Sequence, residues 1–170
     1  MIFLMIVAVD VLYSESTALV AAVVFQQWDA KESLATYTLK REGVAEYIPG
    51  KFYLRELEPI KAVLTRVGKV DTVVIDGYCY LDESGQKGLG AHLYDATAGK
   101  YTIVGVAKNS FKGSPHAVPV CRGDSKKPLF ITSVGMPQEQ AADYISHMSG
   151  DFRMPTLLKK VDSMTRGLRE

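Results

Sequence analysis

Three carboxylates stand at the ends of apolar segments or beside a basic residue. Asp10 follows an apolar run in MIVAVDVLY, Asp76 closes one in TVVIDGY, and Glu56 stands next to Arg55 in YIPGKFYLRE. Aspartate is disfavoured in strands and costly to bury, so an Asp that closes a Val and Ile run is expected at the strand's exposed end. Carboxylate oxygens are the ligands that Mg²⁺ prefers. If two such strand ends lie side by side, these side chains form a divalent-metal site.

Each of these residues has a plainer interpretation on its own. Asp10 can be an ordinary turn residue after a strand, and Asp76-Gly77 is a common turn dipeptide. An Arg-Glu pair on an amphipathic helix is normally exposed to solvent. The metal-site hypothesis therefore depends on the fold bringing the strand ends together.

The size and composition of the chain predict one domain, residues 1–170. The 170 residues are close to the usual length of a single domain, and a hydrophobic content of 47% is enough to fill one core. The formal charge is +1, from 20 basic and 19 acidic residues. Overall charge therefore neither requires nor excludes nucleic acid as a partner.

Two features predict a cytoplasmic protein without a membrane partner. Met1–Val9 is apolar but too short to cross a bilayer, lacks a basic flank and runs directly into Asp10, so we expect a buried first strand. Cys79 and Cys121 are isolated, with no spacing typical of zinc ligation or of a disulfide framework. A reducing cytoplasm is the simplest location, and the oligomeric state stays open.

Hydrophobic periodicity predicts strands and helices in a definite order. The first three apolar segments are joined by polar turns, which is typical of an antiparallel meander, and the alternating third segment is expected at a sheet edge. The continuous Val and Ile run before Asp76 is typical of a central strand, and a long polar loop is expected over 108–127. The expected strands are 2–10, 17–28, 33–41, 70–75, 101–107 and 129–134, and the expected helices are 52–68, 91–96, 137–148 and a last one from Pro155.

This order predicts an α/β fold with a mixed sheet, three antiparallel strands followed by parallel strands, flanked by helices. The right-handed crossover rule lets the first strand pair in parallel with the fourth. Ligands bind at the carboxyl ends of parallel strands, so Asp10 and Asp76 are expected to be neighbours there. The arrangement is that of the ribonuclease H-like fold.

Short motifs spread over nearly the whole chain point to a family. Each motif alone is weak, but their order and spacing together are hard to reach by chance. On these motifs the chain resembles the endonuclease V family. The motifs are DVLY (10–13), YIPG with RE (47–50 and 55–56), IDG (75–77), GLGAHL (88–93), VGVAK (104–108), PLFITSVG (128–135) and FRMPTLLKKVDSMTR (152–166).

The resemblance implies an activity and a cofactor. The family cleaves the second phosphodiester bond on the 3′ side of a deaminated adenine, read as hypoxanthine, in DNA and in some members RNA. The implied function is thus that of a metal-dependent endonuclease in nucleic-acid repair or processing, with inosine- or deoxyinosine-containing nucleic acid as partner. The implied cofactor is Mg²⁺, with Mn²⁺ as a substitute.

The resemblance also implies roles for single residues. Asp10, Glu56 and Asp76 match the residues that hold the metal ion. Asp162 matches a fourth ligand position, although an exposed place on its lysine-rich helix is an equal alternative. Lys108 matches a lysine near the scissile phosphate, where a positive charge would stabilise the leaving oxygen.

Further positions are implied to contact the substrate. The residues Tyr47, Ile48, Pro49 and Gly50 match a loop that acts as a wedge beside the lesion. Hypoxanthine differs from guanine by one missing amino group, so its reader needs a close-fitting pocket around the flipped base. Backbone at Gly50, Gly77, Gly88 and Gly90 can approach a base closely, and these glycines are the candidates for that wall.

One segment departs from the family pattern and keeps other functions open. Residues 78–87 form a longer loop with acidic residues near the place where relatives carry a His, so the loop either weakens phosphate contact or supplies a different metal ligand. The alternative function is a nucleic-acid-binding protein of the same fold with lost or altered catalysis. A small-molecule-binding α/β domain becomes the better hypothesis if the three carboxylates lie far apart.

Overall fold

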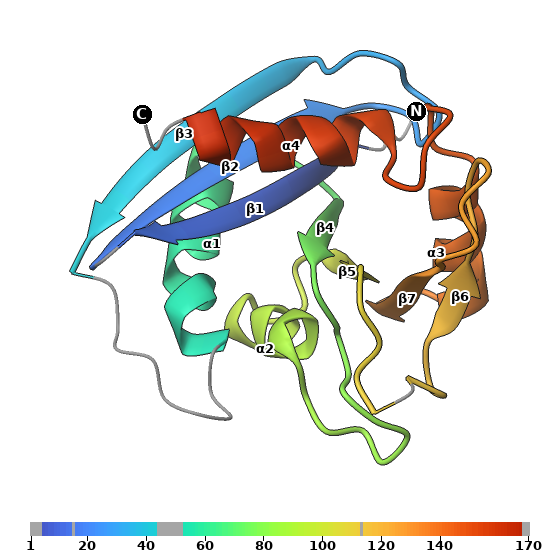
Figure 1. Ribbon diagram of the computed structural model, residues 1–170. Helices are drawn as coiled ribbons and strands as arrows, with labels where there is room; N and C mark the ends of the chain where they lie inside the picture. Colours follow the sequence, from blue (N-terminus) through green and yellow to red (C-terminus); the bar gives the residue numbers. More distant parts are fainter. Residues whose placement is uncertain (1–4, 15, 44–52, 113, 168–170) are drawn as a thin grey trace.

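The computed structural model describes residues 5–14, 16–43, 53–112 and 114–167 and shows a mixed sheet of seven strands with helices on both faces (Figure 1). The strand order is β3-β2-β1-β4-β5-β7-β6, which confirms the predicted α/β class. The strands are β1 (Ile6–Ser14), β2 (Thr17–Phe25), β3 (Ala35–Glu42), β4 (Thr72–Asp76), β5 (Thr102–Ala107), β6 (Val118–Val120) and β7 (Leu129–Val134). The helices are α1 (Tyr53–Val67), α2 (Leu89–Ala96), α3 (Gln138–Ser146) and α4 (Thr156–Gly167).

The first three strands form the predicted antiparallel meander. β1 pairs with β2 from Ile6 opposite Phe25 to Ser14 opposite Thr17, and β2 pairs with β3 along its length. β2 is buried from its second residue onward because it has a strand on each side and helices on each face. β3 has exposed and half-buried residues in alternation, as expected of an edge strand. The meander thus supports β1 along its whole length.

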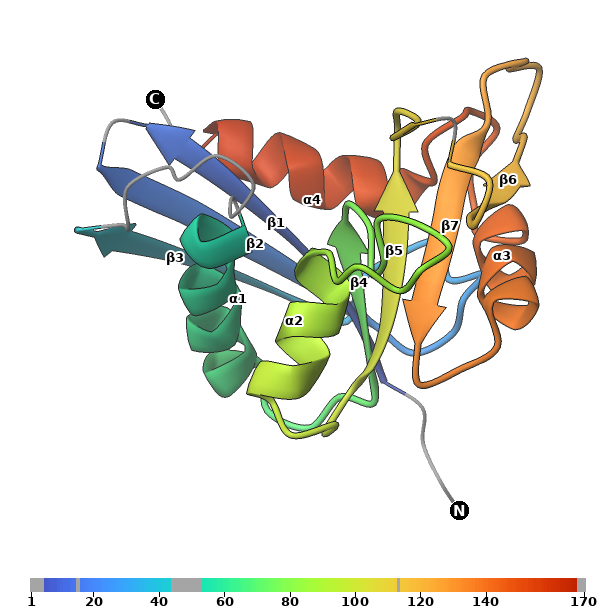
Figure 2. The ribbon, with the colours of Figure 1, turned by 90° about the horizontal axis from the view of Figure 1, so that it is seen from below.

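The parallel pairing between β1 and β4 is short. It runs only from Ile6 opposite Thr72 to Ala8 opposite Val74. Beyond Ala8, β1 continues along β2 and leaves β4, as Figure 2 shows. The prediction that the first strand ends at Asp10 is therefore wrong. The strand runs to Ser14 because antiparallel pairing with β2 supports it after the parallel pairing has ended.

The sheet ends in two antiparallel strands, of which the sequence reveals only one. β7 pairs with β5, and β6 pairs with the outer side of β7. β6 lies inside the segment 108–127, for which the sequence predicts a loop. A three-residue strand with Pro119 at its centre has no readable alternation. Proline is tolerated there because β6 has a partner on one side only.

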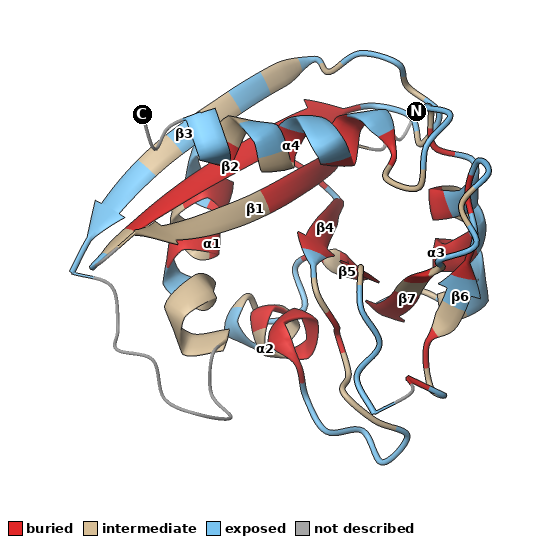
Figure 3. Ribbon diagram, in the orientation of Figure 1, coloured by how far each residue is buried: buried red, intermediate tan, exposed pale blue. Residues whose placement is uncertain are grey.

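Side chains alternate between two cores on opposite faces of the sheet. In β1, Ile6 and Ala8 pack with α3 and α4, whereas Val7 and Val9 pack with α1 and α2. Figure 3 shows buried residues on the sheet and on the helix sides that face it, while the outer side of α4 is exposed. The same alternation decides which face of the sheet a polar residue near a strand end will occupy.

None of the helices in the described ranges combines the length and the apolar character that crossing a bilayer requires.

Gly105 in β5 lets the backbone that follows β4 pass close to the sheet. A Cβ atom at this position would lie 2.6 Å from the Gly77 carbonyl oxygen and 2.7 Å from Thr132 Oγ1. The same Thr132 hydroxyl accepts a hydrogen bond of 2.8 Å from the Cys79 N–H, which holds the turn after Asp76. Gly105 therefore helps to determine where the end of β4 lies.

Replacing Gly105 with Ala is expected to lower the free energy of unfolding by about 1 to 3 kcal/mol. The new methyl group would overlap backbone and a hydroxyl that cannot move without breaking the Cys79–Thr132 hydrogen bond. Urea denaturation measures the change. Gly167→Ala is the matched control, because a Cβ there meets nothing within 4 Å and its stability should be unchanged or slightly higher. Equal unfolding midpoints for Gly105→Ala and the unaltered chain would contradict this account.

Candidate functional site

Strand alternation places three of the predicted residues on one face of the sheet. Val74 packs in the core shared with α4, and Asp76 follows it with the same parity. Ala8 and Val106 also pack in this core. Asp10 lies two residues after Ala8 in β1, and Lys108 lies two residues after Val106, so both belong to the same face of the sheet. All three side chains line one small cavity together with Asp162 of α4. The fold therefore brings together residues that are far apart in the sequence.

Glu56 reaches the same place from the other face of the sheet. It lies in the first turn of α1 and lines a second cavity with Asp10, Asp76 and Leu89. The two cavities, of about 20 and 10 Å³, adjoin because they share Asp10 and Asp76. Each has room for roughly one water molecule or single ion. The divergence of β1 from β4 after Ala8 leaves the space that Glu56 enters.

Burial and mutual repulsion raise the pKa values of the carboxyl groups in this cluster. The pKa of Asp10 is raised to about 7, first by burial and then by Asp76 and Asp162. The pKa of Glu56 is raised to about 8, first by burial and then by Asp76 and Asp10. Desolvation also raises the pKa of Asp76, which Lys108 opposes with its Nζ 3.9 Å from Asp76 Oδ2. For Asp76, burial thus outweighs the opposing charge of this lysine.

The chemistry of the cluster fits a hard divalent cation. No group of three or more His, Cys, Asp or Glu side chains among the described residues is arranged to hold a metal ion as it stands. The donors are nevertheless carboxylate oxygens, which suit Mg²⁺ and Mn²⁺, and a cation between them would offset the burial and the repulsion that raise their pKa values. Donor type and charge therefore fit such an ion.

Helix α4 contributes Asp162 and Thr165 to the cluster. Asp162 lines the first cavity with only 17% of its side chain exposed, and its carboxylate lies 3.4 Å from Arg166. The Thr165 hydroxyl is buried, donates to the Asp162 carbonyl at 2.8 Å and lies 3.4 Å from Asp10 Oδ2. Sequence reasoning misses Thr165, and its position three residues after Asp162 is the one signal that could have found it.

Two arginines whose role the sequence does not reveal hold the segment before α4. Arg122 is buried, and its guanidinium donates to backbone oxygens of residues 148–153 at 2.6, 2.7 and 3.0 Å. Arg153 lies within this segment and donates to the carbonyl of Lys108. The backbone that leads to Asp162 is thereby tied to the backbone of Lys108.

The acidic loop at 78–87 uses its aspartate for local structure. Asp82 Oδ1 accepts hydrogen bonds from the Ser84 N–H at 3.0 Å, the Ser84 hydroxyl at 2.6 Å and the Gln86 N–H at 3.0 Å. These bonds lower the pKa of Asp82 and stabilise the turn. The Asp82 carboxylate is therefore engaged within its own loop, although the sequence offered this loop as a source of a different metal ligand.

The structure describes three of the four candidate glycines, Gly77, Gly88 and Gly90. A Cβ at Gly88 would lie 2.6 Å from the Tyr78 carbonyl oxygen, and one at Gly90 would lie 2.8 Å from Cys79 Cα. Both glycines let the start of α2 pack against the turn after β4, and Gly77 in that turn has a φ of 137°. Their contact with a base stays a prediction. The wedge residues Tyr47, Ile48, Pro49 and Gly50 lie outside the described residues.

Comparisons with known proteins bear on this site. The family model for Endonuclease V matches residues 3–138. Endonuclease V of Pyrococcus abyssi is 38% identical over 110 residues, which cover 65% of this chain and 54% of that protein, about half of its length. Endonuclease V of Pyrococcus horikoshii is 29% identical over 166 residues, which cover 95% of this chain and 73% of that protein.

Solved structures agree on the fold. The crystal structure of endonuclease V from Streptomyces avermitilis has a TM-score of 0.77 and 27% identity, covering 97% of this chain and 81% of that one. Endonuclease V of Ciona intestinalis, in complex with DNA containing an inosine, has a TM-score of 0.81 and 17% identity, covering 98% and 85%. These likenesses confirm the predicted ribonuclease H-like fold and the family resemblance read from the motifs.

Asp10→Asn is expected to stabilise the metal-free protein at pH 8. The pKa of Asp10 rises from 3.8 to about 7 on folding, so the folded state loses stability as pH increases between these values, and the loss is complete above the higher one. Removing the charge should raise the free energy of unfolding at pH 8 by about 1 to 3 kcal/mol, and by much less near pH 4.

The measurement is urea denaturation with EDTA at both pH values. Asp29→Asn is the control, because Asp29 is exposed and its replacement should change stability little at either pH. A less stable Asp10→Asn protein at pH 8 would show that the Asp10 carboxylate is held by favourable contacts and does not repel its neighbours.

Proposed function

Since the chain belongs to the endonuclease V family, we propose that it is a metal-dependent endonuclease that cleaves a phosphodiester bond 3′ to a deaminated base. The observation that carries this proposal is the meeting of Asp10, Asp76 and Glu56 at two adjoining cavities, with Lys108 beside them. The substrate class is DNA or RNA that contains inosine or deoxyinosine, in line with the inosine-containing DNA bound to the Ciona protein. The enzyme would act in nucleic-acid repair or processing in the cytoplasm.

The metal-binding role falls to the carboxylates of the cluster. Asp10, Glu56 and Asp76 would hold Mg²⁺, or Mn²⁺ as a substitute, with Asp162 as a fourth ligand from α4. A bound divalent ion supplies charge neutralisation at the phosphate and lowers the pKa of coordinated water. The raised pKa values of Asp10 and Glu56 support this role, because groups that repel each other in the apo protein gain most from a shared cation.

Lys108 has the position for a second task. Its Nζ lies 3.9 Å from Asp76 Oδ2, and 32% of its side chain is exposed, so it can reach a phosphate bound at the cavity mouth. A fixed ammonium group there would stabilise negative charge that develops on the leaving oxygen. The hydrogen bond from Arg153 to the Lys108 carbonyl keeps the backbone of this lysine in place.

Base recognition would use the backbone near the start of α2. Gly77 lies in the turn after Asp76 with open space where a side chain would be, and Gly88 and Gly90 pack the start of α2 against that turn. Backbone at these three glycines would form the wall that a flipped base approaches. The segment of Tyr47, Ile48, Pro49 and Gly50 would act as the wedge, since a stiff aromatic tip can fill the gap that an extruded base leaves.

A second candidate function is a nucleic-acid-binding protein of this family with lost or altered catalysis. One observation favours it: the carboxylates among the described residues are not arranged as a ready-made metal site. The two functions differ in whether bound oligonucleotide is cut when Mg²⁺ or Mn²⁺ is added. Salt-sensitive binding without cleavage would favour the second function.

The purified chain is expected to cut inosine-containing oligonucleotides with Mg²⁺ or Mn²⁺, and Asp76→Asn is expected to lower the cleavage rate about a thousand-fold. The assay uses labelled single- and double-stranded DNA and RNA, each with and without one inosine. Asp29→Asn serves as the control and should retain full activity, because Asp29 is an exposed residue between β2 and β3. Undiminished cutting by Asp76→Asn would show that the catalytic site is elsewhere.

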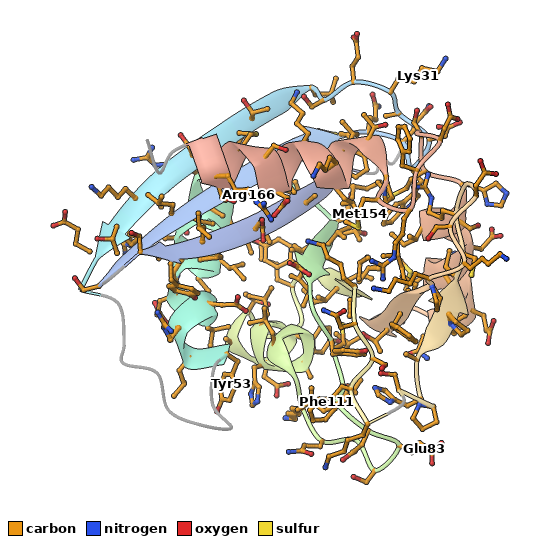
Figure 4. All side chains as sticks on the ribbon, in the orientation of Figure 1. Lys31, Tyr53, Glu83, Phe111, Met154 and Arg166 are labelled. Carbon is orange, nitrogen blue, oxygen red and sulfur yellow. The ribbon has the colours of Figure 1, made fainter. Side chains whose placement is uncertain are left out.

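Lys108→Met is expected to lower kcat about a hundred-fold with a small change in KM, because the ammonium group acts mainly on charge that develops in the transition state. Lys108→Arg should restore part of the rate. Single-turnover cleavage measures the effect. The charge-matched control is Lys31→Met, at an exposed position between β2 and β3 that does not line the cavity (Figure 4). If Lys108→Met raises KM and leaves kcat unchanged, the lysine only binds substrate.

A further inference from the structure

A pair of stacked aromatic rings joins α1 and α2, the two helices that contribute Glu56 and Leu89 to the second cavity. The Tyr53 ring and the His92 imidazole have centroids 3.6 Å apart and planes inclined by 11°. Tyr53 is the first residue of α1, and His92 lies in α2. Figure 4 shows Tyr53 at the start of α1, beside α2. The two rings lie nearly parallel, so α1 and α2 contact each other through the flat faces of these rings.

Helical spacing puts this pair one turn away from the cavity. Residues three apart in a helix share a side, so Tyr53 lies on the side of Glu56, and His92 lies on the side of Leu89. Glu56 and Leu89 both line the cavity that contains Asp10. Three residues of helix span about 4.5 Å, and a strand of duplex DNA rises by about 3.4 Å per nucleotide along the duplex axis. One helical turn is thus of the same order as one or two nucleotides of a bound strand.

The chemical state of the pair suits contact with a base. Tyr53 and His92 are both half-buried, so neither residue is enclosed in a core. Burial and the nearby Lys87 lower the pKa of His92, which keeps the imidazole neutral at pH 7. Lys87 is itself paired with Asp95, which also lies near this histidine. The rings therefore present an uncharged aromatic surface.

From this position we infer that Tyr53 and His92 form a stacking platform for a nucleobase of the substrate strand, one or two nucleotides from the scissile phosphate. Every base has an aromatic face, so such a platform supports binding without reading sequence. It would hold a base that has lost its own stacking partner and so fix the strand over the carboxylates. The inference rests on the proposed function in taking nucleic acid as the substrate.

The test uses the full chain and oligonucleotides that carry 2-aminopurine next to an inosine, because stacking quenches the fluorescence of this base. Binding is measured with EDTA, so that no strand is cut. The unaltered chain should quench the probe, and Tyr53→Leu and His92→Leu should reduce the quenching and raise Kd about 5- to 100-fold. Tyr53→Phe keeps the aromatic face and should behave like the unaltered chain, whereas Tyr53→Trp should bind more tightly.

Thermal unfolding of each variant separates stacking from packing. If Tyr53→Leu melts earlier but keeps its Kd and its quenching, the pair is only a contact between α1 and α2, and the inference is overturned. If Tyr53→Leu does not fold, the comparison of Tyr53→Phe with Tyr53→Trp decides, and equal Kd values for these two overturn it.

The outcomes also separate this inference from the proposed function. Binding with probe quenching by a chain that cuts no inosine substrate would support the platform and contradict the proposed endonuclease. If the chain cuts inosine substrates and its Tyr53 and His92 variants still quench the probe and bind normally, the proposed endonuclease is supported and the platform is contradicted. A chain that binds no oligonucleotide at all would contradict both.

Discussion

The early end of parallel pairing between β1 and β4 is the constraint on which the site depends. The two strands pair only up to Ala8 and Val74, two residues before Asp10 and Asp76. Had the pairing continued, the two strands would have closed the space that Glu56 enters from the other face. Because β2 holds β1 after it leaves β4, the strand can carry a carboxylate in its middle and still be stable.

The rest of the fold supports an arrangement that is unfavourable in itself. Several carboxylates with raised pKa values repel one another, and a functional site commonly costs stability in this way. The two cores on either face of the sheet offset that cost, because β2 and the strand residues beneath the helices are almost fully buried. The cluster is therefore placed directly after strand residues that are almost fully buried.

The C-terminal part of the chain completes the site although the family model ends at residue 138. Helix α4 covers the sheet face that Asp10 and Asp76 share and adds Asp162 and Thr165 to it. Arg122 and Arg153 fix the approach to this helix through backbone carbonyls. Contacts of this kind need no side-chain motif at the receiving end, which explains why the sequence does not display them.

The local sequence pattern alone determined which of the longer segments are strands or helices, and which residues of a strand share one face. The Val and Ile runs predict β1, β2 and β4, and the alternation of two residues already assigns Asp10 and Asp76 to one side of their strands. Motif order was enough to indicate the family. Only the tertiary structure decided where β1 leaves β4, that β6 exists with Pro119 at its centre, and that Asp82 is used by its own turn. The physical reason is that the strand pairings depend on which distant backbone groups find partners, and the Asp82 turn depends on which nearby groups its carboxylate accepts from; neither leaves a periodic signal in the chain.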